Sequence, residues 1–319
     1  MCTALAMEAG RLYFGRTLDH TGSYGERVIV MPRRFPLPMR HERTLEQHYA
    51  MVGIGCMRDG FPLYYDGINE KGLAMAGLNF TQSADYGKPM NGKTNVAQFE
   101  LLPWVLGNCA TVEEARTLLD GICVTDTAFS TELPPARLHW ILADDRETVV
   151  LEIMADGMHM YPNLIGVLAN EPPFPLQMVN LKNYVNLTTD VPENRFSKKL
   201  PLRPYSRGMG ALGLPGDLSS MSRFVRAAFW KEHALWGETE VACTAQFFHL
   251  LDTVKMVKGC CRTEAGEEEY TLYQSCYHNG VCYYTTYENR QITAVDMMQE
   301  NLDGEALISP TLKREPIIG

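Results

Sequence analysis

The start of the chain combines residue types that could carry out nucleophilic catalysis. Cys2 follows Met1, so removal of Met1 would leave a thiol and a free α-amino group on one residue. The amine could take the proton of the thiol and return it later, which makes a complete pair of nucleophile and base. Ordinary pKa values are about 8.5 for a thiol and about 7.7–8.0 for an α-amine, so proton exchange between them needs little tuning. The alternative is that Cys2 is an ordinary residue beside an initiator methionine.

A cation and a carboxylate follow Cys2 at a spacing that could bring them beside it. Alternating residues and a turn-like Ala-Gly pair predict a hairpin of two strands, 3–8 and 12–17. Arg16 and Asp19 lie at the returning end of this hairpin. We therefore expect a guanidinium and a carboxylate next to the thiol.

The composition excludes several classes of protein. Hydrophobic residues make up 45% and charged residues 21% of the 319 residues, which is ordinary for a globular protein. The formal net charge of −9 argues against nucleic acid or an anionic membrane surface as a partner. No stretch approaches the roughly 20 apolar residues of a membrane span. Residues 1–15 lack the apolar region of a secretory signal, and the nine cysteines are scattered, so we expect reduced thiols in a cytoplasm.

The sequence contains no clear metal or cofactor motif. The cysteines lack zinc-site spacing, and the eight histidines include no HExxH pattern, so no metal is expected. Residues 208–213 match G-x-G-x-x-G, but a dinucleotide site needs a preceding strand and a helix that starts within the motif. Residues 214–217, Leu-Pro-Gly-Asp, would stop such a helix, so we expect a glycine-rich loop and no cofactor.

The order of the predicted elements indicates the fold class. The chain is expected to run through strands at 3–8, 12–17, 27–31, 49–55 and 73–79, helices at 96–106 and 111–119, strands at 137–142 and 148–154, helices at 175–184, 220–235 and 244–257, and strands at 269–273, 280–287 and 291–295. Strands and helices come in groups without regular βαβ alternation, which predicts an α+β fold with antiparallel sheets. The length allows one large domain or two smaller ones. Because no linker-like stretch interrupts the chain, we expect one domain over residues 1–319.

Two further stretches differ from their surroundings. The segment 180–217 is rich in proline and glycine yet too apolar for a disordered linker, so we expect it to pack on something, such as another subunit. The helix predicted at 220–235 begins with Arg223 and Arg226 among apolar residues. Either arginine could lie on a solvated face. An arginine in such a run is, however, often buried and paired, as a stabiliser of an anion or a thiolate must be.

Taken together, these residues resemble the choloylglycine hydrolase family, which contains bile salt hydrolases and penicillin V acylases. The resemblance covers essentially the whole chain. It depends on the ordered segments 1–3, 15–19, 66–73, 77–80, 138–140, 165–170, 214–217, 222–226, 287–289 and 301–304. The resemblance implies the N-terminal nucleophile αββα sandwich, cleavage of linear amide C–N bonds, and a homotetramer assembled through segment 180–217.

The resemblance also implies a role for each candidate site residue. Cys2 would be the nucleophile and its freed α-amine the base, and Asp19 would hold that amine. Arg16 and Arg223 would tune the thiolate. Two amide side chains, Asn79 and Asn170, would form the oxyanion hole that acyl transfer through a tetrahedral intermediate requires. The sequence departs from the family at position 169, where alanine stands in place of the expected threonine.

Substrate class follows from the same resemblance. Bile salt hydrolases have asparagine at the position of Asn79, whereas penicillin V acylases tend to have tyrosine. By resemblance, four apolar or aromatic residues line the acyl site: Leu18, Tyr65, Phe129 and Leu133. We therefore expect a hydrolase of glycine- and taurine-conjugated bile acids. The alternatives are a penicillin V acylase and a catalytically silent binder of amphipathic acids.

Overall fold

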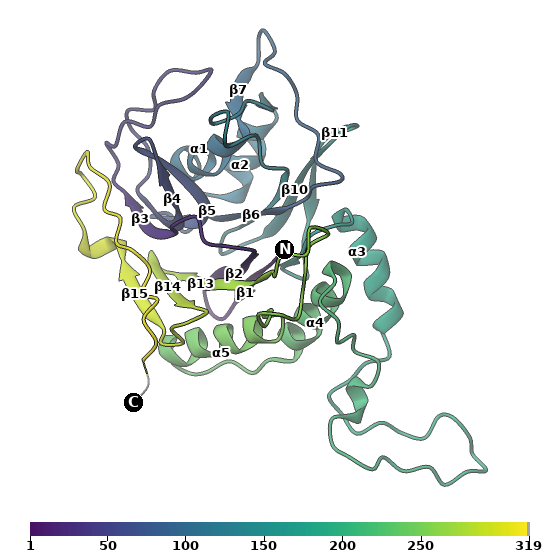
Figure 1. Cartoon of the computed structure of the whole chain (residues 1–319). Helices are drawn as coiled ribbons and strands as arrows, with labels where there is room; N and C mark the ends of the chain where they lie inside the picture. The colour runs from purple at the N-terminus through teal and green to yellow at the C-terminus, as the bar shows by residue number, and fades with distance from the viewer. Residues whose placement is uncertain (318–319) are drawn as a thin grey trace.

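The N-terminal hairpin lies at the centre of the structure, a computed structural model that describes residues 1–317 (Figure 1). Strand β1 (Cys2–Glu8) pairs antiparallel with β2 (Leu12–His20), and the register places Cys2 opposite Leu18. The turn between the strands contains Gly10 at φ 78°, a conformation that glycine adopts without strain. The predicted hairpin is therefore confirmed, and β2 continues three residues beyond its predicted end.

The hairpin forms the middle of a six-stranded sheet with the order β12-β1-β2-β13-β14-β15. The other members are β12 (Val167–Leu168), β13 (Tyr270–His278), β14 (Val281–Thr286) and β15 (Thr293–Asp296). Strand β13 lies so close to β2 that a Cβ atom at Gly15 would come within 1.9 Å of the Ser275 carbonyl oxygen. A glycine at this position therefore permits the close pairing that brings the C-terminal strands to the hairpin.

A seven-stranded antiparallel sheet faces the first one, in the order β11-β10-β9-β6-β5-β4-β3. Its strands are β3 (Arg27–Met31), β4 (Met51–Arg58), β5 (Phe61–Asn69), β6 (Ala74–Asn79), β9 (Leu138–Ala143), β10 (Thr148–Met154) and β11 (Gly157–Pro162). Buried apolar side chains from both sheets fill the space between them. A second apolar cluster joins the seven-stranded sheet to the helices on its outer face.

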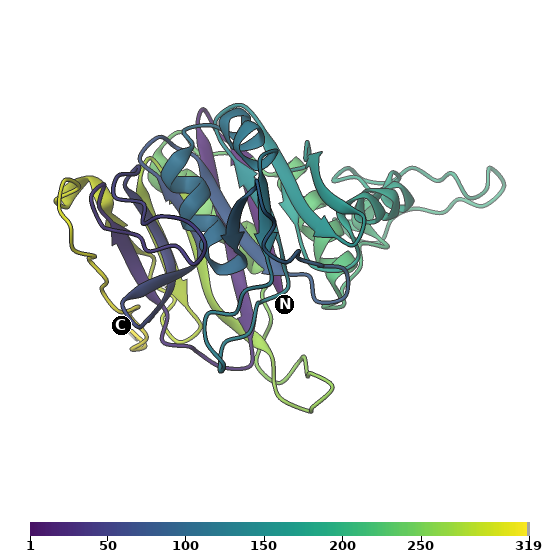
Figure 2. The same cartoon turned by 90° about the horizontal axis from the view of Figure 1, so that it is seen from above.

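Helices cover the outer face of each sheet (Figures 1 and 2). Helices α1 (Leu101–Asn108) and α2 (Val112–Leu119) lie over the seven-stranded sheet, whereas α4 (Ser220–His233) and α5 (Glu240–Asp252) lie under the six-stranded one. The remaining elements are the parallel pair β7 (Thr94–Ala97) and β8 (Ile122–Thr125), helix α3 (Phe174–Leu181), and the 3-10 turns η1 (Gln98–Glu100), η2 (Lys182–Tyr184), η3 (Met209–Ala211) and η4 (Met297–Gln299). The layers are therefore helix, sheet, sheet and helix, which agrees with the predicted α+β class and is the αββα sandwich that the resemblance implies.

Three stretches differ from the sequence prediction. The helix predicted at 96–106 is wrong at its start, because Val96 and Ala97 belong to strand β7 and α1 begins at Leu101. The helix predicted at 244–257 runs from Glu240 to Asp252, because the Thr239 side chain caps its start by accepting from the Ala242 N–H. The sequence prediction also omitted strand β5, whose last residues were assigned to a turn. By contrast, the helix predicted at 111–119 is confirmed, and the hydroxyl of Thr111 caps its start by accepting from the Glu114 N–H at 3.2 Å.

Segment 180–217, called the arm below, projects from the body of the molecule (Figure 2). It contains only the short turns η2 and η3, and the glycine motif at 208–213 lies in a loop rather than between a strand and a helix. Gly208 has φ 78° and opens η3. Across the described residues, no helix combines the length and the apolar composition that a membrane crossing needs.

Candidate active site

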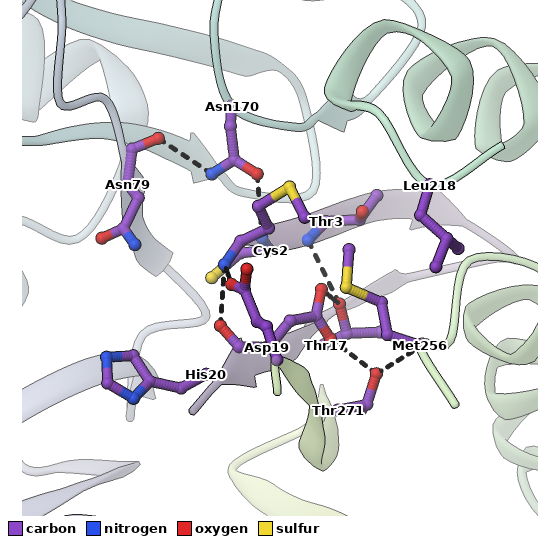
Figure 3. Close-up of polar contacts among 12 residues, drawn as sticks. Cys2, Thr3, Thr17, Asp19, His20, Asn79, Asn170, Leu218, Met256 and Thr271 are labelled. Carbon is purple, nitrogen blue, oxygen red and sulfur yellow. Dashed lines mark hydrogen bonds and ion pairs between the residues drawn. The ribbon is translucent and has the colours of Figure 1, made fainter. Parts of the chain in front are cut away.

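Cys2 lies at the start of the central hairpin with only 3% of its surface exposed. Its side chain lines a cavity of about 460 Å³, called the larger cavity below. Its backbone N–H donates to Asn170 Oδ1 at 2.9 Å (Figure 3). Cys2 therefore borders the larger cavity, and the side chain of Asn170 holds its backbone nitrogen.

Arg16, on β2, is buried beside Cys2 and also lines the larger cavity. Its Nε donates to the Thr17 carbonyl oxygen at 3.1 Å, and Nη1 donates to the carbonyl oxygens of Tyr65 and Gly77 on the opposite sheet. Its Nη2 has no hydrogen-bond partner among the described residues. Burial alone would lower the pKa of Arg16, but the nearby negative groups of Cys2, Tyr273 and Asp66 raise it. Arg16 is thus an anchored cation with a free donor.

Asp19 is fully buried at the end of β2. Its carboxylate accepts from the Thr271 hydroxyl at 2.6 Å and from the Thr17 hydroxyl at 3.1 Å (Figure 3). Its backbone carbonyl accepts from the amine nitrogen of Met1 at 2.8 Å. The Asp19 backbone therefore holds the amine of Met1, whereas the side chain of Asn170 contacts the nitrogen of Cys2.

Asn79 and Asn170 come from separate parts of the chain and lie next to each other near Cys2. Asn79 ends β6, and Asn170 follows β12. The Asn170 Nδ2 donates to the Asn79 carbonyl oxygen at 2.8 Å (Figure 3), which leaves its second proton available. No acceptor within residues 1–317 bonds to the Nδ2 of Asn79. The pair therefore offers amide donors near the thiol.

Arg223, in the first turn of α4, is fully buried, so the expectation of a buried and paired arginine is confirmed. Its Nη1 donates to the Cys2 carbonyl oxygen and to Thr3 Oγ1, each at 2.5 Å, and its Nη2 donates to Asn170 Oδ1 at 2.7 Å. Burial lowers the pKa of this guanidinium. Arg223 thus connects the backbone of the thiol residue with the amide of Asn170.

The four residues expected to line an acyl site all border the larger cavity. They are Leu18, Tyr65, Phe129 and Leu133. Further apolar and aromatic side chains extend this wall: Leu63, Tyr64, Phe99, Pro134, Pro135, Ala136 and Leu138. The cavity can therefore hold a bulky apolar group directly beside the thiol.

A second cavity, of about 340 Å³, adjoins the site and is called the smaller cavity below. Asn79 and His20 border both cavities. The smaller cavity is lined mostly by polar groups: Met1, His20, Thr21, Asn79, Thr81, Asn170, Glu171, Ser220, Thr263 and Glu269. The amine of Met1 lies in it, paired with the Glu269 carboxylate, and burial lowers the pKa of this amine.

With this geometry established, comparison with known proteins gives the family. The model for linear amide C–N hydrolases of the choloylglycine hydrolase family matches residues 2–310. The chain belongs to this family. Within residues 1–317, no group of three or more His, Cys, Asp or Glu side chains is placed to hold a metal ion.

Relatives within the choloylglycine hydrolase family extend over the full chain. A bile salt hydrolase/transferase from Lactiplantibacillus plantarum is 47% identical, over 99% of this chain and 98% of its own. The C2A mutant of the conjugated bile acid hydrolase from Clostridium perfringens superposes with a TM-score of 0.94 at 36% identity, covering 100% of this chain and 99% of its own. A penicillin V acylase from Agrobacterium tumefaciens has a TM-score of 0.76 at 20% identity over the full length of both chains, which shows the shared fold alone. The chain has the N-terminal nucleophile fold of these hydrolases.

Several residues that hold the site of this hydrolase were not expected from the sequence. Ser220 Oγ accepts from the Asn170 N–H at 2.7 Å, and Gln177 Nε2 donates to the Asn170 carbonyl oxygen at 2.5 Å. Thr271 holds Asp19 from a strand some 250 residues later in the chain. Hydroxyl and amide side chains of this kind are common everywhere, so no local sequence signal marks them.

Proposed function

We propose that this protein hydrolyses the amide bond of glycine- and taurine-conjugated bile acids through the thiol of Cys2. The observation that carries the proposal is the position of Cys2, which lines a large apolar cavity together with Asn79 and bonds through its backbone nitrogen to the side chain of Asn170. The names of the relatives from Lactiplantibacillus plantarum and Clostridium perfringens support the same substrate class.

The reaction begins once the residue before Cys2 has been removed and its α-amine is free. The amine takes the proton of the thiol, and the thiolate attacks the carbonyl carbon of the amide. Arg16 stabilises the thiolate with its unpaired Nη2, because the other donors of that guanidinium are bound to backbone carbonyls. The Asn170 Oδ1 holds the nitrogen of Cys2, and the buried charge of Asp19 favours its ammonium form.

The tetrahedral intermediate carries a negative charge on the former carbonyl oxygen. The free amide protons of Asn79 and Asn170 stabilise this oxyanion. The ammonium of Cys2 then protonates the leaving nitrogen, the C–N bond breaks, and glycine or taurine departs while the acyl group remains as a thioester. Water attacks the thioester with the α-amine as base, and the bile acid is released from a regenerated thiol.

The larger cavity suits the steroid part of the substrate. A steroid offers a rigid apolar face, and burial of apolar area contributes about 25 cal/mol per Å². Leu18, Phe129 and Leu133 contribute to the apolar wall that would receive it. The anionic head is the leaving group and can stay near solvent, which suits a chain with a net charge of −9.

The deciding experiment measures kcat/KM for glycocholate, taurocholate and penicillin V on one preparation. We expect release of glycine and taurine with a clear preference for the bile salts, and loss of turnover in Cys2→Ala with the fold intact. A preference for penicillin V would make the protein an acylase with the same mechanism. Tight binding of bile salts without product would identify a silent binder of amphipathic acids.

The arm supports a homotetrameric assembly of one catalytic domain over residues 1–319. It projects from the body and exposes large apolar side chains, with Val185, Phe196 and Tyr205 each more than 80% exposed. A second copy would cover such a surface. Light scattering at micromolar concentration should report a tetramer, whereas a monomer would refute this assembly.

The nine cysteines, all free in the described chain, support a reducing compartment such as the cytoplasm.

A further inference from the structure

A buried histidine lies between the two segments that carry the amides of the site. His139, on β9, is fully buried. Its ring stacks on Phe80 with the ring centroids 4.3 Å apart and the planes 6° apart, and its Nε2 lies 3.0 Å from the Ala169 carbonyl oxygen. Phe80 follows Asn79, and Ala169 precedes Asn170. One side chain therefore contacts the neighbours of both amide residues.

A glutamate on the adjacent strand holds this histidine. Glu152, on β10, is also fully buried, and its Oε1 lies 3.0 Å from His139 Nδ1. The same oxygen accepts from the Phe174 N–H at 2.9 Å. The dyad of His139 and Glu152 thus contacts residues 169 and 174, the two ends of the turn that carries Asn170. Because the dyad bonds to Ala169 at one end of the turn and to Phe174 at the other, a shift of the turn would break at least one of these two hydrogen bonds.

The hydrogen bonds determine how many protons the dyad holds. The Ala169 carbonyl only accepts, so His139 Nε2 must carry a proton. The contact between Nδ1 and the Glu152 Oε1 needs a second proton between those two atoms. The dyad therefore holds two protons and is neutral as a unit, which suits its full burial. Removal of either member would leave an uncompensated polar group in the core.

We propose that His139, held by Glu152, is a positioning residue that aligns Asn79 and Asn170 on the oxyanion. This inference rests on the proposed amidase function and adds a residue outside the reacting groups. It also accounts for the alanine at position 169. His139 supports Asn170 through the backbone carbonyl of Ala169, which any residue at position 169 would provide. The threonine side chain expected there is therefore not needed.

Two substitutions at position 139 separate positioning from simple packing. In His139→Asn the amide can replace Nδ1 toward Glu152 but cannot reach the Ala169 carbonyl, whereas the longer amide of His139→Gln can replace Nε2. We expect kcat for glycocholate to fall about 100-fold in His139→Asn, the scale of a misplaced oxyanion donor, with KM within about twofold. His139→Gln should recover at least about tenfold of this loss. The alkylation rate of Cys2 by iodoacetamide should stay unchanged in both.

A second buried histidine provides a matched control. His278 stacks on Tyr13 with centroids 3.9 Å apart, its Nδ1 lies 2.8 Å from the Leu12 carbonyl oxygen, and its Nε2 lies 3.9 Å from a Glu240 carboxylate oxygen. Like His139, it is buried, stacks on an aromatic ring and contacts a backbone carbonyl, but it lies at the end of the hairpin away from Cys2, and its Nε2 lies 2.9 Å from Asn279 Nδ2. His278→Asn should lower the melting temperature and leave kcat unchanged.

All rates are divided by the amount of folded protein, measured by size-exclusion chromatography and near-UV circular dichroism, so unfolded chains do not count. The proposal is overturned if His139→Asn retains kcat within about threefold of the wild type, or loses no more than His278→Asn. An inactive wild type in the same assay would refute the proposed function instead, so the two failures remain distinct.

Discussion

The larger and the smaller cavity share Asn79 and His20 but differ in the residues that complete them. The larger is mainly apolar and aromatic, with Phe129 and Leu133 from the loop before β9. The smaller contains hydroxyl groups and two carboxylates, Glu171 and Glu269. No lysine or arginine is among the described residues that line it, and burial lowers the pKa of His20, so that ring is neutral near pH 7.

The two linings indicate that the larger cavity would serve substrate binding and the smaller cavity would serve the chemical step. The apolar cavity can supply binding free energy through burial, and it is the proposed site of the acyl group. The polar cavity includes Asn170, whose side chain accepts from the Cys2 nitrogen, and no lysine or arginine among the described residues lines it to retain an anionic amine product. We therefore expect changes in the larger cavity to alter substrate affinity, and changes in the smaller one to alter turnover and the response to the charge of the head group.

The largest effect should come from retention of Met1, which occupies the smaller cavity. In a chain that retains Met1, the nitrogen of Cys2 is an amide, and the free amine belongs to Met1 and pairs with Glu269. We expect turnover at least about 1,000-fold below that of a chain beginning at Cys2, because an amide nitrogen is no base. Cleavable fusions can deliver both forms, and intact mass identifies them. Equal kcat values for the two would exclude the amine as base.

The next effect should come from the wall that the two cavities share. Asn79→Ala removes a proposed oxyanion donor, so kcat should fall about 100- to 1,000-fold with little change in KM. Initial rates with taurocholate test this expectation. Asn91→Ala, at an exposed turn outside the arm, is the matched control and should behave as the wild type. A rise in KM at constant kcat would assign Asn79 to substrate binding only.

A smaller effect is expected in the larger cavity. Leu133→Ala removes apolar contact with the acyl group, so KM should rise about tenfold for glycocholate and taurocholate alike. Leu164→Ala, at a side chain that is 96% exposed, serves as the control. If the loss differed strongly between the two head groups, the assignment of this cavity to the acyl group would be wrong.

The smallest effect concerns the charge of the smaller cavity. Glu269→Gln removes a carboxylate that faces the departing anion, so kcat/KM for both conjugates should rise about two- to fivefold at low salt and less at high salt. A neutral glycinamide conjugate should show no change. Glu267→Gln removes the same charge from an exposed site nearby and should have no effect. An equal gain on the neutral conjugate would contradict the electrostatic explanation.

The part of the site that depends on local pattern could be predicted from the sequence. Alternation and a turn-like dipeptide predict the hairpin, and the hairpin alone brings Arg16 and Asp19 to Cys2. Asn79, Asn170 and the four larger-cavity residues came from resemblance, since nothing local distinguishes one asparagine from another. The structure then places these residues around Cys2.

Other features depend on contacts between distant segments and could not be predicted. Strand β5 contains Asp66 and Gly67, which are typical of turns. Asp66 is fully buried in the structure because hydroxyls of Tyr273, Ser275 and Tyr277 on β13 donate to its carboxylate. The smaller cavity likewise combines residues from six separate stretches of the chain. The periodicity of residues within one segment cannot predict which distant segments come into contact.

The hairpin also has a consequence for the order in which the site forms during folding. Cys2 and Leu18 pair across a short loop, which closes at little entropic cost and early in folding. Arg223 bonds to the Cys2 carbonyl across 221 residues of sequence, and Asn170 reaches the Cys2 nitrogen across 168. Cys2 and Arg16 therefore come together first, and Arg223 and Asn170 join them later. A nascent or half-folded chain carries its nucleophile but no hydrolase activity.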